Sequence, residues 1–314
     1  CSFLEEISIP LSVTMIEKNS FNGCESLKSV IIPSSITSIE DSTFNGCISL
    51  NKTTIPTSVT LIKSNSFSYC KALKEIEIPT SVTNIGPMSF NGCISLERIS
   101  LPSSINKIET GCFSCCSSMK QISIPLSIIS IEKNSFLYCS SLTEIFIPSS
   151  VKSIGPNAFS NCSNLTKITI NPYMTNIEKN SFQNCPSLIN FTFSEDVISI
   201  QNFNFNEYFH IKKITIPNSV TRIERNSFSQ CNSLVQITIP SSVTFIGDYC
   251  FQDCENLKQI SIPSSVTSLG SGAFLYCSSL TQINISSSIN SLNDRIFEGC
   301  RFLSTILIPS SINS

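Results

Sequence analysis

This sequence has no tryptophan, a single histidine and few charged residues. Charged side chains make up 13% of the 314 residues, about half the share typical of globular proteins. The near balance of 20 basic and 22 acidic residues argues against a nucleic-acid-binding protein, which needs a basic surface to neutralise phosphates. No apolar run approaches the roughly 18 residues that a membrane-spanning helix requires, so no direct membrane span is expected in this segment.

The scarcity of histidine restricts the catalytic possibilities. Any Ser/His/Asp or Cys/His site has to be built around His210, which stands where an equivalent repeat position holds Ser233. The 10 glycines form no phosphate-binding G-x-x-x-x-G-K-[ST] loop. The adjacent Glu195 and Asp196 would point to opposite faces of an extended segment, which does not suit an acid/base pair. We therefore expect no catalytic, cofactor-binding or metal-binding residues, and a hydrolase built on His210 is the competing class.

The chain also lacks an initiator methionine and a basic, apolar leader segment at its start. It opens on Cys1, which already belongs to a repeating pattern, and neither end shows an atypical capping repeat. We interpret residues 1–314 as a single repeat array and as a fragment of a longer chain without visible caps.

What the sequence does contain is a strict period of 23 residues. Phenylalanine stands at thirteen successive registers from Phe21 to Phe297 without a gap. Cysteine recurs from Cys1 to Cys300 with one omission, where Tyr208 stands. The consensus is C-x-x-L-x-x-I-x-I-P-x-S-V-T-x-I-x-x-x-x-F-x-x, and it runs through 13 full repeats plus a partial one with no insertion or deletion.

The spacing of apolar residues predicts the path of each repeat. The L-x-x-I-x-I segment alternates like a strand with one buried face, and the following proline ends it. The V-x-x-I segment predicts a second short extended piece, and F-x-x-C-x-x-L predicts a helical or 3₁₀ turn. One repeat has too few inward residues to offset the entropy of ordering it, so neighbours must cover its faces. The pattern therefore predicts a solenoid in which identical side chains stack in columns.

The repeat resembles the BspA-like leucine-rich repeat family. The phrase L-x-x-I-x-I-P-x-S-V-T-x-I-G-x-x-A-F-x-x-C is closely matched by residues 151–162 and 266–277, and the resemblance covers essentially the whole chain. It implies a curved, right-handed, β-rich superhelix with a parallel sheet on one face and few or short helices. It also implies a surface or secreted protein with roles in adhesion and protein binding, and it carries over no catalytic motif.

The 16 cysteines suggest a disulfide scaffold or a metal site at first sight. Thirteen of them, however, form one column of the repeat, in which neighbouring Cβ atoms stay about 4.8 Å apart, too far for easy disulfide geometry. We expect a ladder of buried thiols that pack as small hydrophobes. The C-F-S-C-C stretch of Cys112, Cys115 and Cys116 leaves two alternatives open, a zinc site and a local disulfide of Cys115.

Outward-facing strand positions form the first candidate binding surface. They are the two residues before the first isoleucine of each repeat and the one between the two isoleucines. The basic residues there are Lys28, Lys52, Lys74, Arg98, Lys120, Lys167, Lys212, Lys213 and Lys258, and the acidic ones are Glu5, Glu6, Glu75, Glu77, Glu97 and Glu144. This excess of basic residues predicts a partner docking on the sheet face, with Lys120, Lys167, Lys212 and Lys213 as contact residues. A solvated surface without a specific partner is the competing interpretation.

The irregular repeats around residue 200 form the second candidate. Phe203, Phe209 and Ile189 fall outside the core registers, so the pattern predicts that they are exposed. Exposed aromatic groups mark contact sites in many proteins. Decay of the repeat with local repacking is the alternative.

Taken together, these features predict a non-enzymatic, protein-binding repeat protein that is surface-associated and adhesion-related. The alternative is an intracellular protein–protein interaction scaffold, which would share the fold and differ in compartment. The localisation expected from the resemblance is the cell surface or the secreted fraction, with the cytoplasm as the alternative. The partner is a protein ligand rather than a nucleic acid, and the sequence does not identify it.

Overall fold

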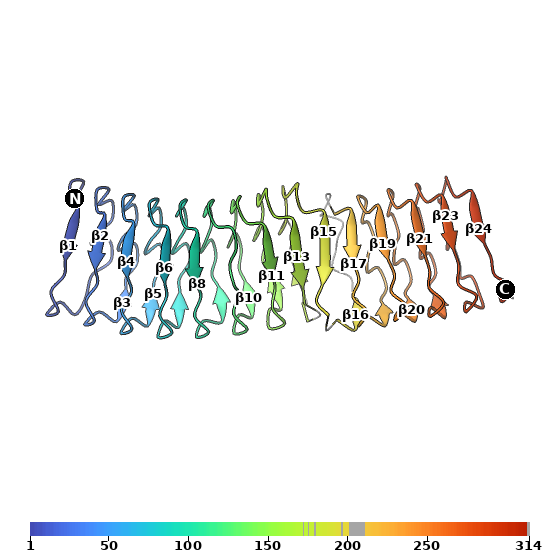
Figure 1. Cartoon of the computed structure of the whole chain (residues 1–314), viewed down its shortest axis with the longest axis horizontal. Coiled ribbons are helices and arrows are strands. Elements are labelled where there is room, and N and C mark those ends of the chain that lie inside the picture. Colours follow the sequence, from blue (N-terminus) through green and yellow to red (C-terminus); the bar gives the residue numbers. More distant parts are fainter. Residues whose placement is uncertain (172, 175, 179, 196, 201–210, 313–314) are drawn as a thin grey trace. The chain divides into compact units, whose positions relative to one another are not determined.

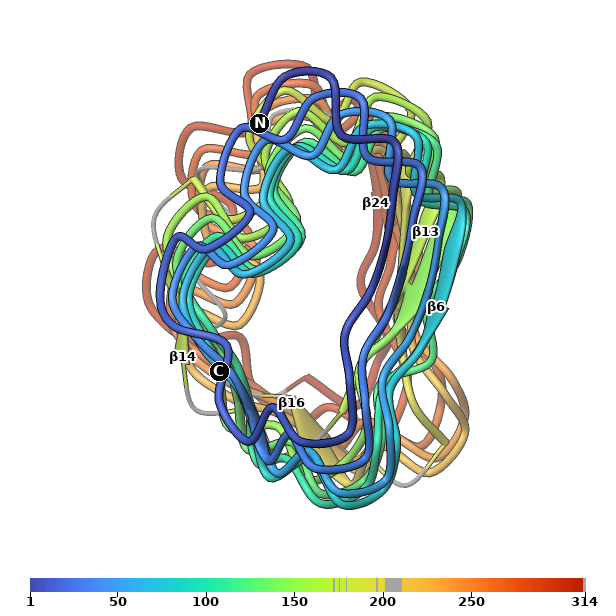
Figure 2. The ribbon, with the colours of Figure 1, turned by 90° about the vertical axis from the view of Figure 1, so that its left-hand side faces the viewer.

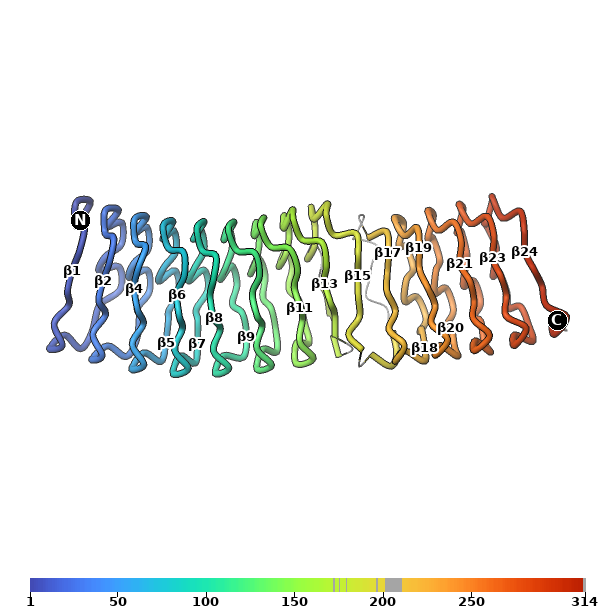
Figure 3. Tube along the Cα trace, viewed as in Figure 1, coloured from blue at the N-terminus to red at the C-terminus, as the bar shows by residue number. Residues whose placement is uncertain are grey.

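The computed structural model describes residues 1–171, 173–174, 176–178, 180–195, 197–200 and 211–312. Within these residues the chain forms 24 β-strands and no helix (Figure 1). Its contacts divide it into unit 1, which comprises Cys1–Leu165 and Tyr173–Ser187, and unit 2, which comprises Thr166–Pro172 and Leu188–Ser314. Each unit is a parallel β-solenoid in which successive 23-residue coils stack side by side (Figure 3).

The first strand of a coil lies where the I-x-I segment predicts it. In unit 1 these strands are β1 (Glu6–Ser8), β2 (Ser29–Ile31), β4 (Lys52–Thr54), β6 (Glu75–Glu77), β8 (Arg98–Ser100) and β11 (Glu144–Phe146). In unit 2 they are β13 (Lys167–Ile170), β15 (Asn190–Phe193), β17 (Lys213–Thr215), β19 (Gln236–Thr238), β21 (Gln259–Ser261), β23 (Gln282–Asn284) and β24 (Thr305–Leu307).

The V-x-x-I segment forms a second, two-residue strand. In unit 1 these strands are β3 (Ser38–Ile39), β5 (Leu61–Ile62), β7 (Asn84–Ile85), β9 (Lys107–Ile108), β10 (Ser130–Ile131), β12 (Ser153–Ile154) and β14 (Asn176–Ile177). In unit 2 they are β16 (Ser199–Ile200), β18 (Arg222–Ile223), β20 (Phe245–Ile246) and β22 (Ser268–Leu269). Within unit 1, the first-strand sheet at β6 and the second-strand sheet at β14 lie on different sides of the coil (Figure 2).

Every paired strand is parallel to its neighbour and in a register of one repeat. Ile7 lies opposite Val30, and Lys213 lies opposite Gln236, each pair 23 residues apart. The central residue of a three-residue first strand points inward and its neighbours point outward, as the exposed–buried–exposed pattern of β6 shows. A register of one full repeat therefore places identical core positions on top of one another, and the predicted columns are confirmed.

The turn between the phenylalanine and the leucine differs from the predicted helical or 3₁₀ turn. It is a series of tight turns in which Cys70 N–H donates to Phe67 O at 3.2 Å and Leu73 N–H donates to Cys70 O at 3.2 Å. Two positions per coil take positive φ, as at Asn65 (57°) and Tyr69 (57°), and such residues interrupt a right-handed helix. The amides freed in this way bond to the next coil, for example Phe67 N–H to Ser89 O at 2.9 Å.

Stacked phenylalanine rings occupy the middle of the core. In unit 1 the rings from Phe21 to Phe182 form seven consecutive stacked pairs with centroids 5.1–5.8 Å apart. In unit 2 the rings from Phe228 to Phe297 form three more pairs with centroids 5.4–6.0 Å apart. Offset stacking at these distances adds a specific attraction to the burial of the rings.

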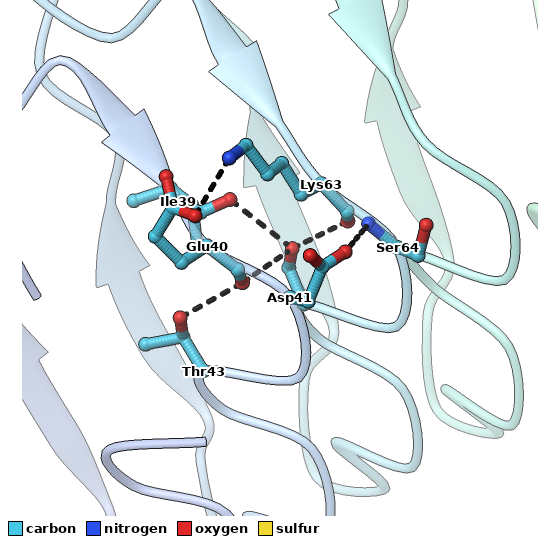
Figure 4. A network of polar contacts seen from close by, with 7 residues as sticks. Ile39, Glu40, Asp41, Thr43, Lys63 and Ser64 are labelled. Carbon is cyan, nitrogen blue, oxygen red and sulfur yellow. Dashed lines mark hydrogen bonds and ion pairs between the residues drawn. The ribbon is translucent and has the colours of Figure 1, made fainter. Parts of the chain in front are cut away.

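The small polar residues of the repeat bond to the preceding coil. The serine of the P-x-S segment donates to a backbone carbonyl 22 residues earlier, as Ser58 does to Ile36 O at 2.7 Å. Acidic residues at some turns bond instead to the following coil. Asp41 accepts the Ser64 N–H at 3.0 Å, and Glu40 pairs with Lys63 at 2.7 Å, which holds the pKa of the Glu40 carboxyl below its ordinary value (Figure 4). Most side chains that recur with the period therefore hold one coil to the next.

Candidate functional site

The outward residues of the first strands form an exposed face on each unit. We define the sheet face of a unit as the two residues that precede the first inward residue of each first-strand segment and the residue that follows it. Side chains there are exposed or half-buried, whereas most of the inward residues between them are buried, as Ile214 (1% exposed) and Ile237 (5% exposed) are. The face thus lies on a core that is nearly identical from coil to coil, and its own residues vary.

Charge is distributed differently on the two sheet faces. The face of unit 1 mixes both signs and carries five basic residues (Lys28, Lys52, Lys74, Arg98, Lys120) and six acidic ones (Glu5, Glu6, Glu75, Glu77, Glu97, Glu144). The face of unit 2 carries four lysines (Lys167, Lys212, Lys213, Lys258) and no carboxylate. The excess of basic residues that the sequence shows along the whole array therefore belongs to unit 2.

The lysines predicted as contact residues lie on these faces. Lys120 is exposed on unit 1. Lys167 begins β13, and Lys212 and Lys213 lie at the start of β17, all three exposed on unit 2. The structure thus brings Lys167, Lys212 and Lys213 together on one face and assigns Lys120 to the other unit.

The aromatic candidates cannot be placed in the same way. Phe203 and Phe209 lie outside the described residues, as do Tyr208 and His210. Ile189, which the pattern also predicts to be exposed, is 43% exposed on the sheet face of unit 2, so that part of the prediction is confirmed. Val235, 38% exposed two coils further on in the same column, was not singled out from sequence because valine also suits the interior of a strand.

The cysteines form the ladder of buried thiols that the repeat predicts. All sixteen are free, and of the thirteen in the column only Cys1 and Cys300 are not buried. The thiols donate to the phenylalanine carbonyl of the preceding coil, as Cys93 does to Phe67 O at 3.1 Å. Burial raises the pKa of Cys93 to about 12. The described residues contain no group of three or more His, Cys, Asp or Glu side chains arranged to hold a metal ion.

Cys115 does not join its neighbours in a disulfide. It takes a positive φ of 61° and is half-buried, in the turn register that Tyr138 fills one coil later, whereas Cys112 and Cys116 are buried on the inside. Its nearest polar partner is the Ser114 hydroxyl, with Oγ and Sγ 3.7 Å apart. The C-F-S-C-C stretch is therefore three thiols with different surroundings.

We expect the rate of reaction with a thiol reagent to distinguish the buried cysteines of the ladder from the accessible ones. In the folded chain at pH 8, only Cys1 and Cys115 should react quickly. Access is blocked at the buried positions, and burial raises the pKa of the half-buried Cys300 to about 12. In denaturant all sixteen thiols should react. Quantifying released thionitrobenzoate under both conditions measures this. Rapid reaction of six or more thiols in the folded state would contradict the buried ladder.

In the part of the chain that the structure describes, there is no helix of the length and hydrophobicity that crossing a bilayer requires.

Comparison with known proteins agrees with this architecture. The family model described as "BspA type Leucine rich repeat region (6 copies)" matches over residues 1–120, 106–234 and 199–314. A leucine-rich repeat protein from Bacteroides ovatus is similar in structure, with 30% sequence identity, a TM-score of 0.61 and coverage of 90% of this chain and 79% of that chain. A leucine rich cell surface protein from Faecalibacterium prausnitzii shares 26% identity, with a TM-score of 0.46 and coverage of 96% and 87%. No curated protein matches the sequence.

The family model therefore matches the chain from residue 1 to residue 314. The chain belongs to the BspA-type leucine-rich repeat family.

Proposed function

We propose that this chain is a non-enzymatic, protein-binding repeat protein that acts at the cell surface in adhesion. The observation that carries the proposal is the sheet face, where residues differ from coil to coil above a core that does not. A solenoid uses such a surface to bind an extended partner, because its coils present many side chains at fixed spacing. The surface location is an expectation from the family, and an intracellular scaffold with the same fold is the alternative.

The described residues offer little support for a catalytic centre. Most thiols of the ladder are buried, and burial raises the pKa of several of them, as at Cys47 and Cys93, which makes those thiols poor nucleophiles. The remaining large feature of each unit is its exposed face. Binding through that face would use the exposed Lys120, Lys167, Lys212 and Lys213 and needs no group that the described residues lack.

The proposal predicts that the chain binds purified extracellular-matrix or host-cell surface proteins through its lysines. Reversing the charge of Lys120, Lys167, Lys212 and Lys213 together should abolish that binding, because a partner selected by a basic face would then meet a repulsive one. Surface plasmon resonance with the immobilised chain measures the affinity. Circular dichroism of the variant controls for folding, since exposed lysines contribute little to stability.

Two further results test the proposal. Replacing Phe203 and Phe209 with alanine should weaken binding without changing the melting temperature if these residues make contacts, and should lower the melting temperature if they pack. Failure of every matrix and cell-surface protein to bind would contradict the adhesion role. Unchanged affinity of the four-lysine variant would contradict the lysine contacts.

A further inference from the structure

The sheet face of unit 2 differs from the rest of its unit. By sequence, unit 2 carries nine acidic and eight basic residues, so it is close to neutral. Its sheet face nevertheless has four lysines and no carboxylate, while the acidic residues stand elsewhere, as Glu224 does beside Arg222 after β18. Seven successive first strands without one acidic outward residue form a distinct positive surface, although the unit's composition is balanced.

Among the residues that the structure describes, the four lysines of this face have no acidic partner. None of the ion pairs formed within the described residues includes Lys167, Lys212, Lys213 or Lys258. On unit 1, by contrast, Lys28 pairs with Glu5 of the preceding coil at 2.7 Å, and this contact raises the Lys28 pKa. The basic residues of the unit 1 face thus share it with six carboxylates, one of which pairs with Lys28, whereas the unit 2 face has lysines and no carboxylate.

The lysines recur at every second coil. Lys167 lies opposite Asn190, and Asn190 lies opposite Lys213. In the adjacent column, Val235 N–H donates to Lys212 O at 3.0 Å, and Lys258 follows one coil later in the same register. Parallel strands lie about 4.8 Å apart, so positive charge repeats about every 9.6 Å along the face. A complementary partner would present carboxylates at the same interval.

Neutral and aliphatic side chains fill the intervals between the lysines. Ile189 and Val235 alternate with Lys212 and Lys258 in one column, and they remain 43% and 38% exposed. Because a nucleic acid carries a phosphate about every 1.7 Å and its bases stack on aromatic rings, this sparse charge suits it poorly. The sheet face of unit 2 carries no aromatic residue at any of its positions. Alternating aliphatic and cationic groups fit a protein segment that carries acidic and apolar side chains.

We propose that the sheet face of unit 2 binds an extended acidic segment of a protein partner, with one carboxylate for every two coils. This inference rests on the proposed protein-binding function and specifies the ligand of that surface. A polyproline II segment has three residues per turn and rises about 3.1 Å per residue. An acidic residue at every third position therefore places carboxylates on one side about 9.3 Å apart, close to the lysine interval. The apolar residues between them meet Ile189 and Val235.

The test uses the full chain and two labelled peptides of equal composition. One is five repeats of Glu-Pro-Pro, and the other has five consecutive glutamates followed by ten prolines. Fluorescence anisotropy in low salt should show the repeating peptide binding more tightly. Reversing Lys167, Lys212, Lys213 and Lys258 to glutamate should weaken this binding by about tenfold or more, because several exposed ion pairs are lost together. The matched control reverses Lys28, Lys52, Lys74 and Arg98 on unit 1 and should leave binding within about threefold.

Four results would overturn the inference. Equal binding of the two peptides would show that the face does not select carboxylates at the two-coil interval. Equal losses of affinity in the unit 2 variant and the unit 1 control would show that the peptide does not bind specifically to unit 2. Tighter binding of heparin than of the repeating peptide, lost in the unit 2 variant, would assign the face to a polysaccharide. If matrix proteins bind the unit 2 variant as well as the unreversed chain, the protein-binding function stands, whereas this inference fails together with the proposed contacts of Lys167, Lys212 and Lys213.

Discussion

Phe136→Ala is expected to lower the free energy of unfolding of unit 1 by about 3–5 kcal/mol, the range measured for a fully buried phenylalanine. The Phe136 ring is 0% exposed and stacks between Phe113 and Phe159, with centroids 5.5 and 5.1 Å away. Removing it leaves a cavity and breaks the stack on both sides. The rings above and below cannot close the gap, because the backbone hydrogen bonds between coils fix the coil spacing.

Phe146→Ala is the matched control, because it deletes the same atoms ten residues away. Phe146 is the last residue of β11, on the sheet face of unit 1, and it is 59% exposed. Its loss should cost less than about 1 kcal/mol. Guanidinium titration followed by circular dichroism measures both variants. Equal losses from the two variants would show that the ring stack does not stabilise the solenoid.

The period alone determined much of what the structure shows. Thirteen phenylalanine registers and the I-x-I alternation predict which residues point inward, and the exposed–buried–exposed pattern of strands such as β6 confirms them. The buried thiol ladder follows from the same argument. A repeat with an unbroken period restricts the fold so strongly because an outward position in one coil has to be outward in every coil.

The repeat period did not predict the conformation of the turns. Positive φ usually selects glycine or asparagine, and Gly23 and Asn65 follow that rule. The same two registers also hold Tyr69, Met88 and Arg295, which carry no such signal. The contacts of the structure explain some of these cases. The Tyr69 ring lies over Gly92 of the next coil, where an added Cβ would come within 2.6 Å of it.

The charge pattern of the candidate surface was only partly predictable. Outward lysines could be identified from register, and Lys167, Lys212 and Lys213 are exposed on one face. Charge summed along the whole array conceals that the acidic partners all stand on unit 1, because the boundary between the units is a property of three-dimensional contacts. Phe203 and Phe209 stay predictions, since they fall outside the described residues.

The thiol ladder predicts that unit 1 loses stability steeply at alkaline pH. Burial raises the pKa values of Cys47 and Cys93 to about 12, and it also raises those of Cys70, Cys116 and Cys139. An unfolded cysteine has a pKa of about 8.5. Between about pH 9 and pH 12 the unfolded chain therefore releases protons that the folded chain keeps, so each rise in pH favours unfolding.

The size of this effect follows from the number of thiols. Each thiol that ionises only in the unfolded state lowers the free energy of unfolding by about 1.4 kcal/mol per pH unit, and full stabilisation is present only below the unfolded pKa. Five such thiols lower it by about 7 kcal/mol per pH unit, which is comparable with the whole stability of a typical domain. We therefore expect unit 1 to unfold by about pH 10 in the presence of a reductant. Guanidinium titrations at half-unit steps from pH 7 to pH 10 measure the slope.

Two single variants show whether the ladder causes the alkaline unfolding. Cys93→Ala removes one buried thiol and should reduce the slope by about 1.4 kcal/mol per pH unit. Cys115→Ala removes a half-buried thiol in the turn, outside the ladder, and should leave the slope unchanged. Lysine and tyrosine side chains titrate in the same range, but they are shared by both variants and cancel in the comparison. Identical slopes for the two variants would mean that the buried thiols do not govern the pH dependence of stability. A difference of the expected size would show that the thiol column, which bonds one coil to the next, also limits the pH range in which the coils remain folded.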